Sequence, residues 1–155
     1  MRIFWIILFL GMSFLKAQDV KVSLFAQHDL SSVWVTTFVS DFYILATDAN
    51  WDPIDTVLDI YSEANLRTIL FKENEGRVEI LSSGKSLGSY SGLILSQRDS
   101  GNFIIAGKGK ERIYEGNLLL RSYYSNLQVV NEIDLESYVA GVVESEGGHV
   151  VEKEY

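Results

Sequence analysis

Short runs of alternating apolar and polar residues cover most of the chain between residues 19 and 132. In the first run, residues 20–26, Val, Val, Leu and Ala alternate with Lys, Ser and Phe, as is typical of a half-buried strand. Further apolar runs follow at short intervals: VWVTTFV, FYILAT, RTILF, RVEILSS, GLILSQR, NFIIA, LLLRSYY and LQVVNE. The pattern predicts an antiparallel, β-rich body of short strands over residues 19–132.

Residues that favour turns separate these runs. Residues 50–56, which contain Asp52-Pro53, are the clearest predicted loop. Residues 74–76 (Asn-Glu-Gly) and 99–102 (Asp-Ser-Gly-Asn) predict hairpin turns between antiparallel neighbours. Residues 125–126 (Ser-Asn) separate the last two predicted strands.

The period of the pattern changes from two to that of a helix after residue 132. At about 100° per residue, five apolar side chains fall on one helix face: Leu135, Tyr138, Val139, Val142 and Val143. Asp134 is a natural N-cap, and Gly147-Gly148 is a natural stop. The sequence therefore predicts one strongly amphipathic helix over residues 134–146, and the fold class is α+β.

Glu146 lies at the end of this apolar stripe, about 20° from Leu135, whereas Glu144 points the opposite way. A core-facing glutamate is uncommon because burying an unpaired charge is costly. Burial on the apolar face and the negative end of the helix dipole both predict a raised pKa for Glu146. The alternative is that the helix frays at this point and Glu146 is solvated.

The first 17 residues resemble a secretory signal peptide. Arg2 precedes an apolar run over residues 3–15, and Ala17 provides a small residue for cleavage. About 13 apolar residues are few for a transmembrane anchor, so we expect export without a stable membrane anchor. Removal of residues 1–17 takes away two positive charges and changes the formal net charge from −8 to −10. This charge, with no basic run, argues against nucleic acid as a partner.

Composition excludes several kinds of chemistry. The absence of cysteine excludes disulfides, thiolate metal sites and a cysteine nucleophile. His28 and His149 are the only histidines, too few for a metal site on their own. Residues 107–110 (Gly-Lys-Gly-Lys) are too short for a phosphate-binding loop and are interpreted as a turn. We expect no metal and no cofactor.

Three strings of the sequence together resemble the SpoIID/LytB family of sporulation stage II protein D and amidase-enhancer relatives. They are VKVSL (20–24), RIYEGNL (112–118) and, most specifically, VVNEIDLESYVAGVVESE (129–146). The resemblance covers the family's N-terminal part only. It implies action on cell-wall peptidoglycan, where sporulation members are lytic transglycosylases that cut glycan strands. The glutamate that ends the Gly-Val-Val-x-Ser-Glu motif is their proposed catalytic acid, and that role falls on Glu146.

The sequence also departs from the family pattern. Gly147 stands where the family usually has Met, and the chain ends at Tyr155, before the family's Lys-Ala-Gln-Ala-like and Arg-Thr-Tyr-like runs. We therefore expect residues 18–155 to be an incomplete domain with a truncated end over residues 147–155. Such a fragment is expected to be inactive on glycan and to leave part of the helix face uncovered.

Glu146 is the candidate acid and base, and His149 and Tyr114 are weaker candidates for contact with substrate. Glu132 and Glu136 are interpreted as solvated, although either is also placed to line a cleft. Three functions remain open: a lytic transglycosylase acting on peptidoglycan glycan strands, a non-catalytic enhancer that binds a cell-wall amidase or the glycan, and an inactive scaffold or remnant.

Overall fold

The computed structural model describes residues 18–26, 29–37, 42–48, 50–60, 67–97, 102–107 and 109–147. The predicted signal peptide, residues 1–17, lies outside these ranges, as do His28 and His149. The described residues form twelve strands and one helix: β1 (Asp19–Leu24), β2 (Ser32–Thr37), β3 (Phe42–Thr47), β4 (Pro53–Ile60), β5 (Arg67–Asn74), β6 (Arg77–Ser82), β7 (Lys85–Tyr90), β8 (Gly92–Gln97), β9 (Asn102–Gly107), β10 (Lys110–Glu115), β11 (Asn117–Tyr123), β12 (Asn126–Asp134) and α1 (Leu135–Gly147).

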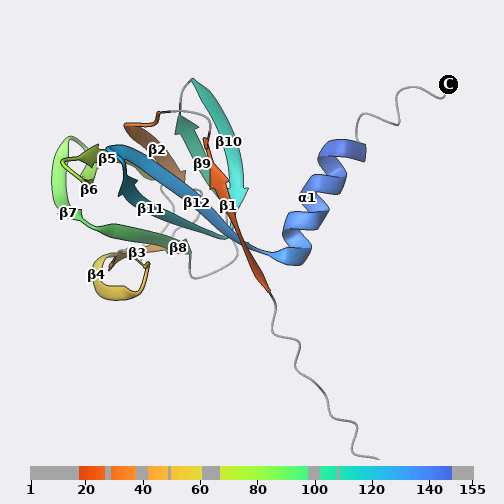
Figure 1. Ribbon diagram of the computed structural model, residues 1–155, viewed down its shortest axis with the longest axis horizontal. Coiled ribbons are helices and arrows are strands. Elements are labelled where there is room, and N and C mark those ends of the chain that lie inside the picture. The colour runs from red at the N-terminus through yellow and green to blue at the C-terminus, as the bar shows by residue number, and fades with distance from the viewer. Residues whose placement is uncertain are drawn as a thin grey trace, which may run out of the picture.

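The strands form two six-stranded antiparallel sheets (Figure 1). The first sheet has the order β1-β12-β11-β8-β3-β4, and the second has the order β10-β9-β2-β5-β6-β7. The two sheets meet where β11 lies against β5 and β6, and where β12 lies against β5 and β10. This arrangement confirms the predicted antiparallel β-rich body followed by a single helix.

One apolar core fills the space between the sheets. Phe42 of the first sheet and Phe71 and Phe103 of the second are fully buried. Along β9 buried residues alternate with half-buried ones, as the sequence pattern predicts. Each fully buried large side chain contributes about 1.5–3 kcal/mol of hydrophobic stabilisation, so the core accounts for the stability of the β-rich body.

Three strands, β4, β7 and β10, were not predicted. Each is the edge strand of its sheet and pairs on one side only. None of the described side chains of these three strands is fully buried, and their apolar alternation is weak. Edge position alone does not explain this, because β1 is also an edge strand and was predicted from its alternation. The loop prediction for residues 50–56 is wrong from Pro53 onward, since β4 begins there. Proline is tolerated at the first residue of an edge strand because its missing N–H is not needed for pairing.

Two of the three predicted chain reversals are hairpins. Glu75 and Gly76 have φ values of 52° and 81° and join β5 to β6, which form an antiparallel pair. At the β11–β12 hairpin the turn residues are Tyr124 and Ser125, one position before the predicted pair. The prediction of a hairpin at residues 99–102 is wrong, because β8 and β9 belong to different sheets.

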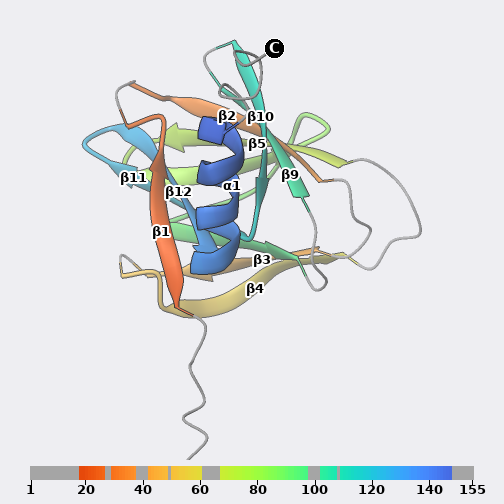
Figure 2. The same cartoon turned by 90° about the vertical axis from the view of Figure 1, so that its right-hand side faces the viewer.

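Helix α1 projects from the end of β12 and stands beside the two sheets (Figures 1 and 2). It has 13 residues. No helix in the described part of the chain is long and apolar enough to cross a membrane.

Candidate functional site

The Glu146-bearing helix follows β12 without a loop. Asp134 ends the strand and caps the helix, since its Oδ1 accepts a hydrogen bond of 2.9 Å from the Ser137 amide. Hydrogen bonds from the Ser137 hydroxyl and amide lower the pKa of Asp134. The amide of Leu135 donates to the carbonyl of Gln18 at 2.9 Å. The predicted cap is therefore confirmed, and the start of the helix is tied to both β12 and the residue before β1.

Three of the five residues of the apolar stripe of α1 are exposed and do not face the core, although the sequence pattern predicts a core-facing stripe with only part of it uncovered. Leu135, Val139 and Val143 are 42%, 49% and 63% exposed. Ser137 and Val142 are half-buried. Val142 and Tyr138 belong to the stripe but line the groove beside the sheets, so the stripe is only partly turned toward the strands. The helix contacts β1 and β12, and Figure 2 shows it standing in front of them. The outer part of the stripe is therefore open to solvent in the described part of the chain.

A groove of about 720 Å³ runs between α1 and strands β1, β10 and β12. Tyr114 of β10 and Tyr138 of α1 both line it, and so does Arg112 of β10. Tyr114 is half-buried and also packs against the core, which fixes its position. The structure therefore brings one of the two weaker candidates, Tyr114, to a groove beside the helix. A groove lined by aromatic rings and a few polar groups is a common form of ligand site.

Glu144 also lines this groove. The sequence pattern places Glu144 opposite the apolar stripe and so predicts that it points away from the core. That reasoning assumed a core-facing stripe, and the observed rotation of α1 instead turns the side that carries Glu144 toward the groove. Glu144 is exposed and becomes a second carboxylate to test.

Glu146 occupies the last turn of α1, and its side chain lies outside the described residues. His149 likewise lies outside them. The structure therefore places Glu146 by its position along the helix, and the predictions of its raised pKa and of a substrate contact by His149 stay predictions.

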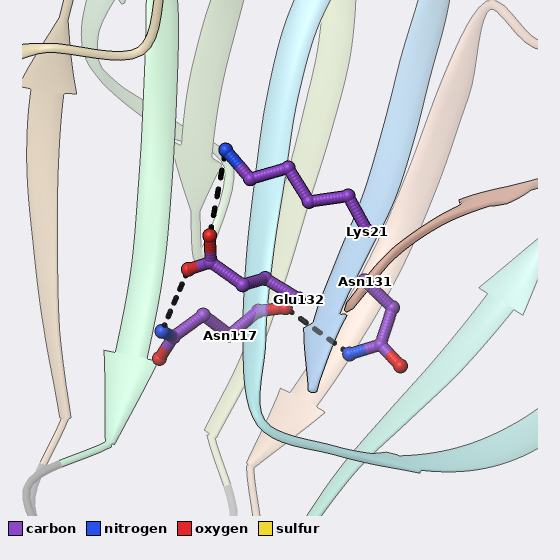
Figure 3. Close-up of polar contacts among 4 residues, drawn as sticks. All are labelled: Lys21, Asn117, Asn131 and Glu132. Atoms are coloured by element: carbon purple, nitrogen blue, oxygen red, sulfur yellow. Dashed lines mark hydrogen bonds and ion pairs between the residues drawn. The ribbon is translucent and has the colours of Figure 1, made fainter. Parts of the chain in front are cut away.

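A polar network fixes the base of the helix (Figure 3). Glu132 forms an ion pair with Lys21 at 3.4 Å and accepts a hydrogen bond of 3.1 Å from the Asn117 side chain. The side-chain amide of Asn131 donates hydrogen bonds to the backbone carbonyls of Glu115 and Asn117 at 2.7 and 3.1 Å. These contacts join β1, β12 and the link between β10 and β11. The last residues of β12, and hence the start of α1, are fixed by contacts with β1, β10 and β11.

Glu132 is therefore not the solvated residue that the sequence suggested. Its side chain is 22% exposed and bonded to Lys21 and Asn117. Local sequence carries no signal of the Lys21 contact, because the partner lies on β1, more than a hundred positions away in the chain. The cross-strand register that aligns Lys21 with Glu132 supplies the missing information.

We expect Asn131→Leu to destabilise the protein by about 1–3 kcal/mol, because Asn131 is 5% exposed and its amide satisfies two carbonyl groups. Urea unfolding measures this loss of free energy. Asn74→Leu is the matched control, since Asn74 is exposed and its side chain lies 3.4 Å from Glu79, and it should change stability by no more than about 0.5 kcal/mol. Equal stability of the two variants would contradict the anchoring role.

In the ranges that the structure covers, no group of three or more His, Asp or Glu side chains is placed to hold a metal ion. No family model, no curated protein and no solved structure matches this chain. A function is therefore inferred from the sequence motif over residues 129–146 together with the geometry of the groove and helix.

Proposed function

We propose that this is an exported protein that acts on peptidoglycan glycan strands by lytic transglycosylase-like cleavage, with Glu146 as the acid and base. One observation carries the proposal. The string that resembles the SpoIID/LytB family, residues 129–146, forms a single unit in which β12 leads into a capped helix beside a groove of about 720 Å³. Two tyrosines in that groove, Tyr114 and Tyr138, suit contact with sugar rings.

The proposed chemistry needs one carboxyl group. The protonated acid gives its proton to the glycosidic oxygen between N-acetylmuramic acid and N-acetylglucosamine, and the bond from the muramyl C1 to that oxygen breaks. The carboxylate then takes the proton of the muramyl C6 hydroxyl, while the C6 oxygen forms a new bond to C1. The product ends in a 1,6-anhydromuramyl group, and the glutamic acid is regenerated. The substrate supplies its own nucleophile, so a second carboxylate is not required.

The acid must be protonated near neutral pH, which requires exclusion of water around it. The exposed stripe of Leu135, Val139 and Val143 supports the proposal that α1 is covered in the active protein, by bound glycan or by further protein.

The same exposed stripe favours a second candidate, a non-catalytic enhancer that binds a cell-wall amidase. An apolar helix face with Glu136 and Glu144 on its flanks is a common form of protein-binding surface. Gly147, in place of the family's usual Met, also favours this candidate.

Product analysis with the full-length exported protein distinguishes the two candidates. Incubation with purified, peptide-free glycan strands should release fragments with 1,6-anhydromuramyl ends, which mass spectrometry identifies by the loss of one water relative to hydrolytic products. If no such fragments form, yet the protein accelerates a purified cell-wall amidase, the enhancer function replaces the catalytic one.

A further inference from the structure

Two exposed tyrosines lie at the tip of the hairpin that joins β11 to β12. Tyr124 is 83% exposed and Tyr123 is 52% exposed. Their ring centroids are 4.5 Å apart and their planes are inclined at 78°, which is an edge-to-face pair. The pair holds the rings in a defined relative position while leaving the ring of Tyr124 largely open to solvent.

The backbone at this tip is unfavourable for tyrosine. The φ angles of Tyr124 and Ser125 are 50° and 59°, in the left-handed region where hairpin turns usually carry Asn and Gly. The β6–β7 hairpin has the same left-handed pair but places Gly84 at its second position. A tyrosine that costs backbone energy and buries little of its ring contributes little to stability. A role in binding explains its presence better.

The surroundings of the pair are polar and hollowed. A depression of about 460 Å³ separates the hairpin tip from the segment that follows β1. Asp29, Asn126 and Gln128 line it together with the two tyrosines. The side-chain amide nitrogen of Asn126 donates a hydrogen bond to the backbone carbonyl of Tyr124 at 3.3 Å, and it lies 3.5 Å from the Asp29 carboxylate. The tyrosine rings thus adjoin the side-chain amide of Asn126 and the carboxylate of Asp29. Such groups form hydrogen bonds with hydroxyl and acetamido groups.

We propose that this hairpin tip, defined by Tyr123, Tyr124, Asn126 and Asp29, is a second binding site for N-acetylated glycan. A pyranose ring presents a face of C–H groups that packs on the Tyr124 ring, while its polar rim hydrogen-bonds to Asn126 and Asp29. The choice of glycan rests on the proposed function, in which glycan strands are the substrate.

None of the four residues that define the site lines the groove beside α1, although Leu24 of β1 lines both the groove and the depression at the tip. Strand β12 begins at the hairpin tip and ends at the helix, and eight residue steps of about 3.3 Å place the two ends about 26 Å apart. Figure 1 shows the tip and α1 on opposite sides of the β-rich body. Glycan bound at the tip is therefore centred away from the helix, and the amide signals of Asn126 and Gln128, which do not line the groove, report on the tip.

Backbone amide chemical shifts test this site separately from the groove. Titration of the full-length Glu146→Gln protein, which is not expected to cleave, with a chitin oligosaccharide should shift the amide signals of Asn126 and Gln128. Tyr124→Asn in that background should weaken binding at the tip by about tenfold. The same change should leave thermal stability equal or higher, because Asn adopts left-handed φ more readily than Tyr. Tyr124→Phe, which keeps the ring, should retain the binding.

Trp34→Ala is the control, since Trp34 is 49% exposed but lies on β2 of the second sheet. It should leave the shifts at the tip unchanged. Tip amides that do not move at saturating oligosaccharide, or that move equally in the Tyr124→Asn protein, overturn the inference. Cleavage of glycan is assayed separately, so an inactive protein that binds at the tip argues against the proposed function alone.

Discussion

Glu146→Gln is expected to lower the formation of 1,6-anhydromuramyl ends by about 100-fold to 10,000-fold in the full-length protein. Glutamine keeps the shape and volume of the side chain but cannot release and regain a proton, so both halves of the proposed reaction fail. Mass spectrometry of glycan products measures the loss, and circular dichroism should show an unchanged fold. Binding of uncleaved glycan should be largely preserved, because the proposed role is in proton transfer.

Glu144→Gln is the matched control from the same helix turn. Glu144 is exposed and lines the groove, whereas Glu146 lies at the end of the apolar stripe. If Glu146 is the acid, Glu144→Gln should retain most of the activity. If Glu144→Gln alone abolishes the products, the groove-lining carboxylate is the acid and the assignment to Glu146 is wrong. Wild-type rates in both variants would favour the enhancer function.

Gly116→Ala is expected to be the most damaging glycine substitution that the structure suggests, with a cost of about 2–5 kcal/mol. Gly116 links β10 of the second sheet to β11 of the first and has a φ of 86°. A Cβ atom there would overlap the backbone carbonyl oxygen of Glu132, which cannot move without disturbing β12. Since small proteins are stable by about 5–15 kcal/mol, urea unfolding should show a large loss or an unfolded protein.

Gly84→Ala separates the cost of a left-handed φ from the cost of the overlap between the new Cβ atom and the Glu132 carbonyl oxygen. Gly84 has a similar φ of 76°, but no atom lies within 4 Å of a Cβ placed there. It should show only the backbone cost of about 1–2 kcal/mol. A Gly116→Ala protein no less stable than the Gly84→Ala protein would show that the contact with Glu132 does not constrain the fold.

The sequence predicts the elements whose apolar residues recur with a clear period, including the edge strand β1 and the partly exposed helix α1. Central strands such as β9 carry clear alternation, and the capped helix is evident from Asp134 and its apolar spacing. Edge strands such as β7 carry little apolar signal and were missed. The hairpin prediction at residues 99–102 failed because turn chemistry marks a change of direction and does not say which strand becomes the partner.

The candidate site was predicted less fully. Periodicity places Glu146 on the stripe of α1, but it does not say which way the stripe faces. The structure exposes that stripe and turns Glu144 toward the groove. The network around Glu132 depends on strand pairing between β1 and β12, which joins residues far apart in the chain. Such contacts follow from register, and local sequence patterns do not specify register between distant strands.

The direct junction between β12 and α1 means that the rotation of the helix is set by the pairing of a strand. Strand β12 is hydrogen-bonded to β1 on one side and β11 on the other, so its register is fixed twice. Inserting one residue between Asn131 and Asp134 would advance every later position by about 100° around the helix axis. Ser137 and Val142 would leave the sheets, and a different face would meet the groove. This short segment thus tolerates substitution far better than a change in length.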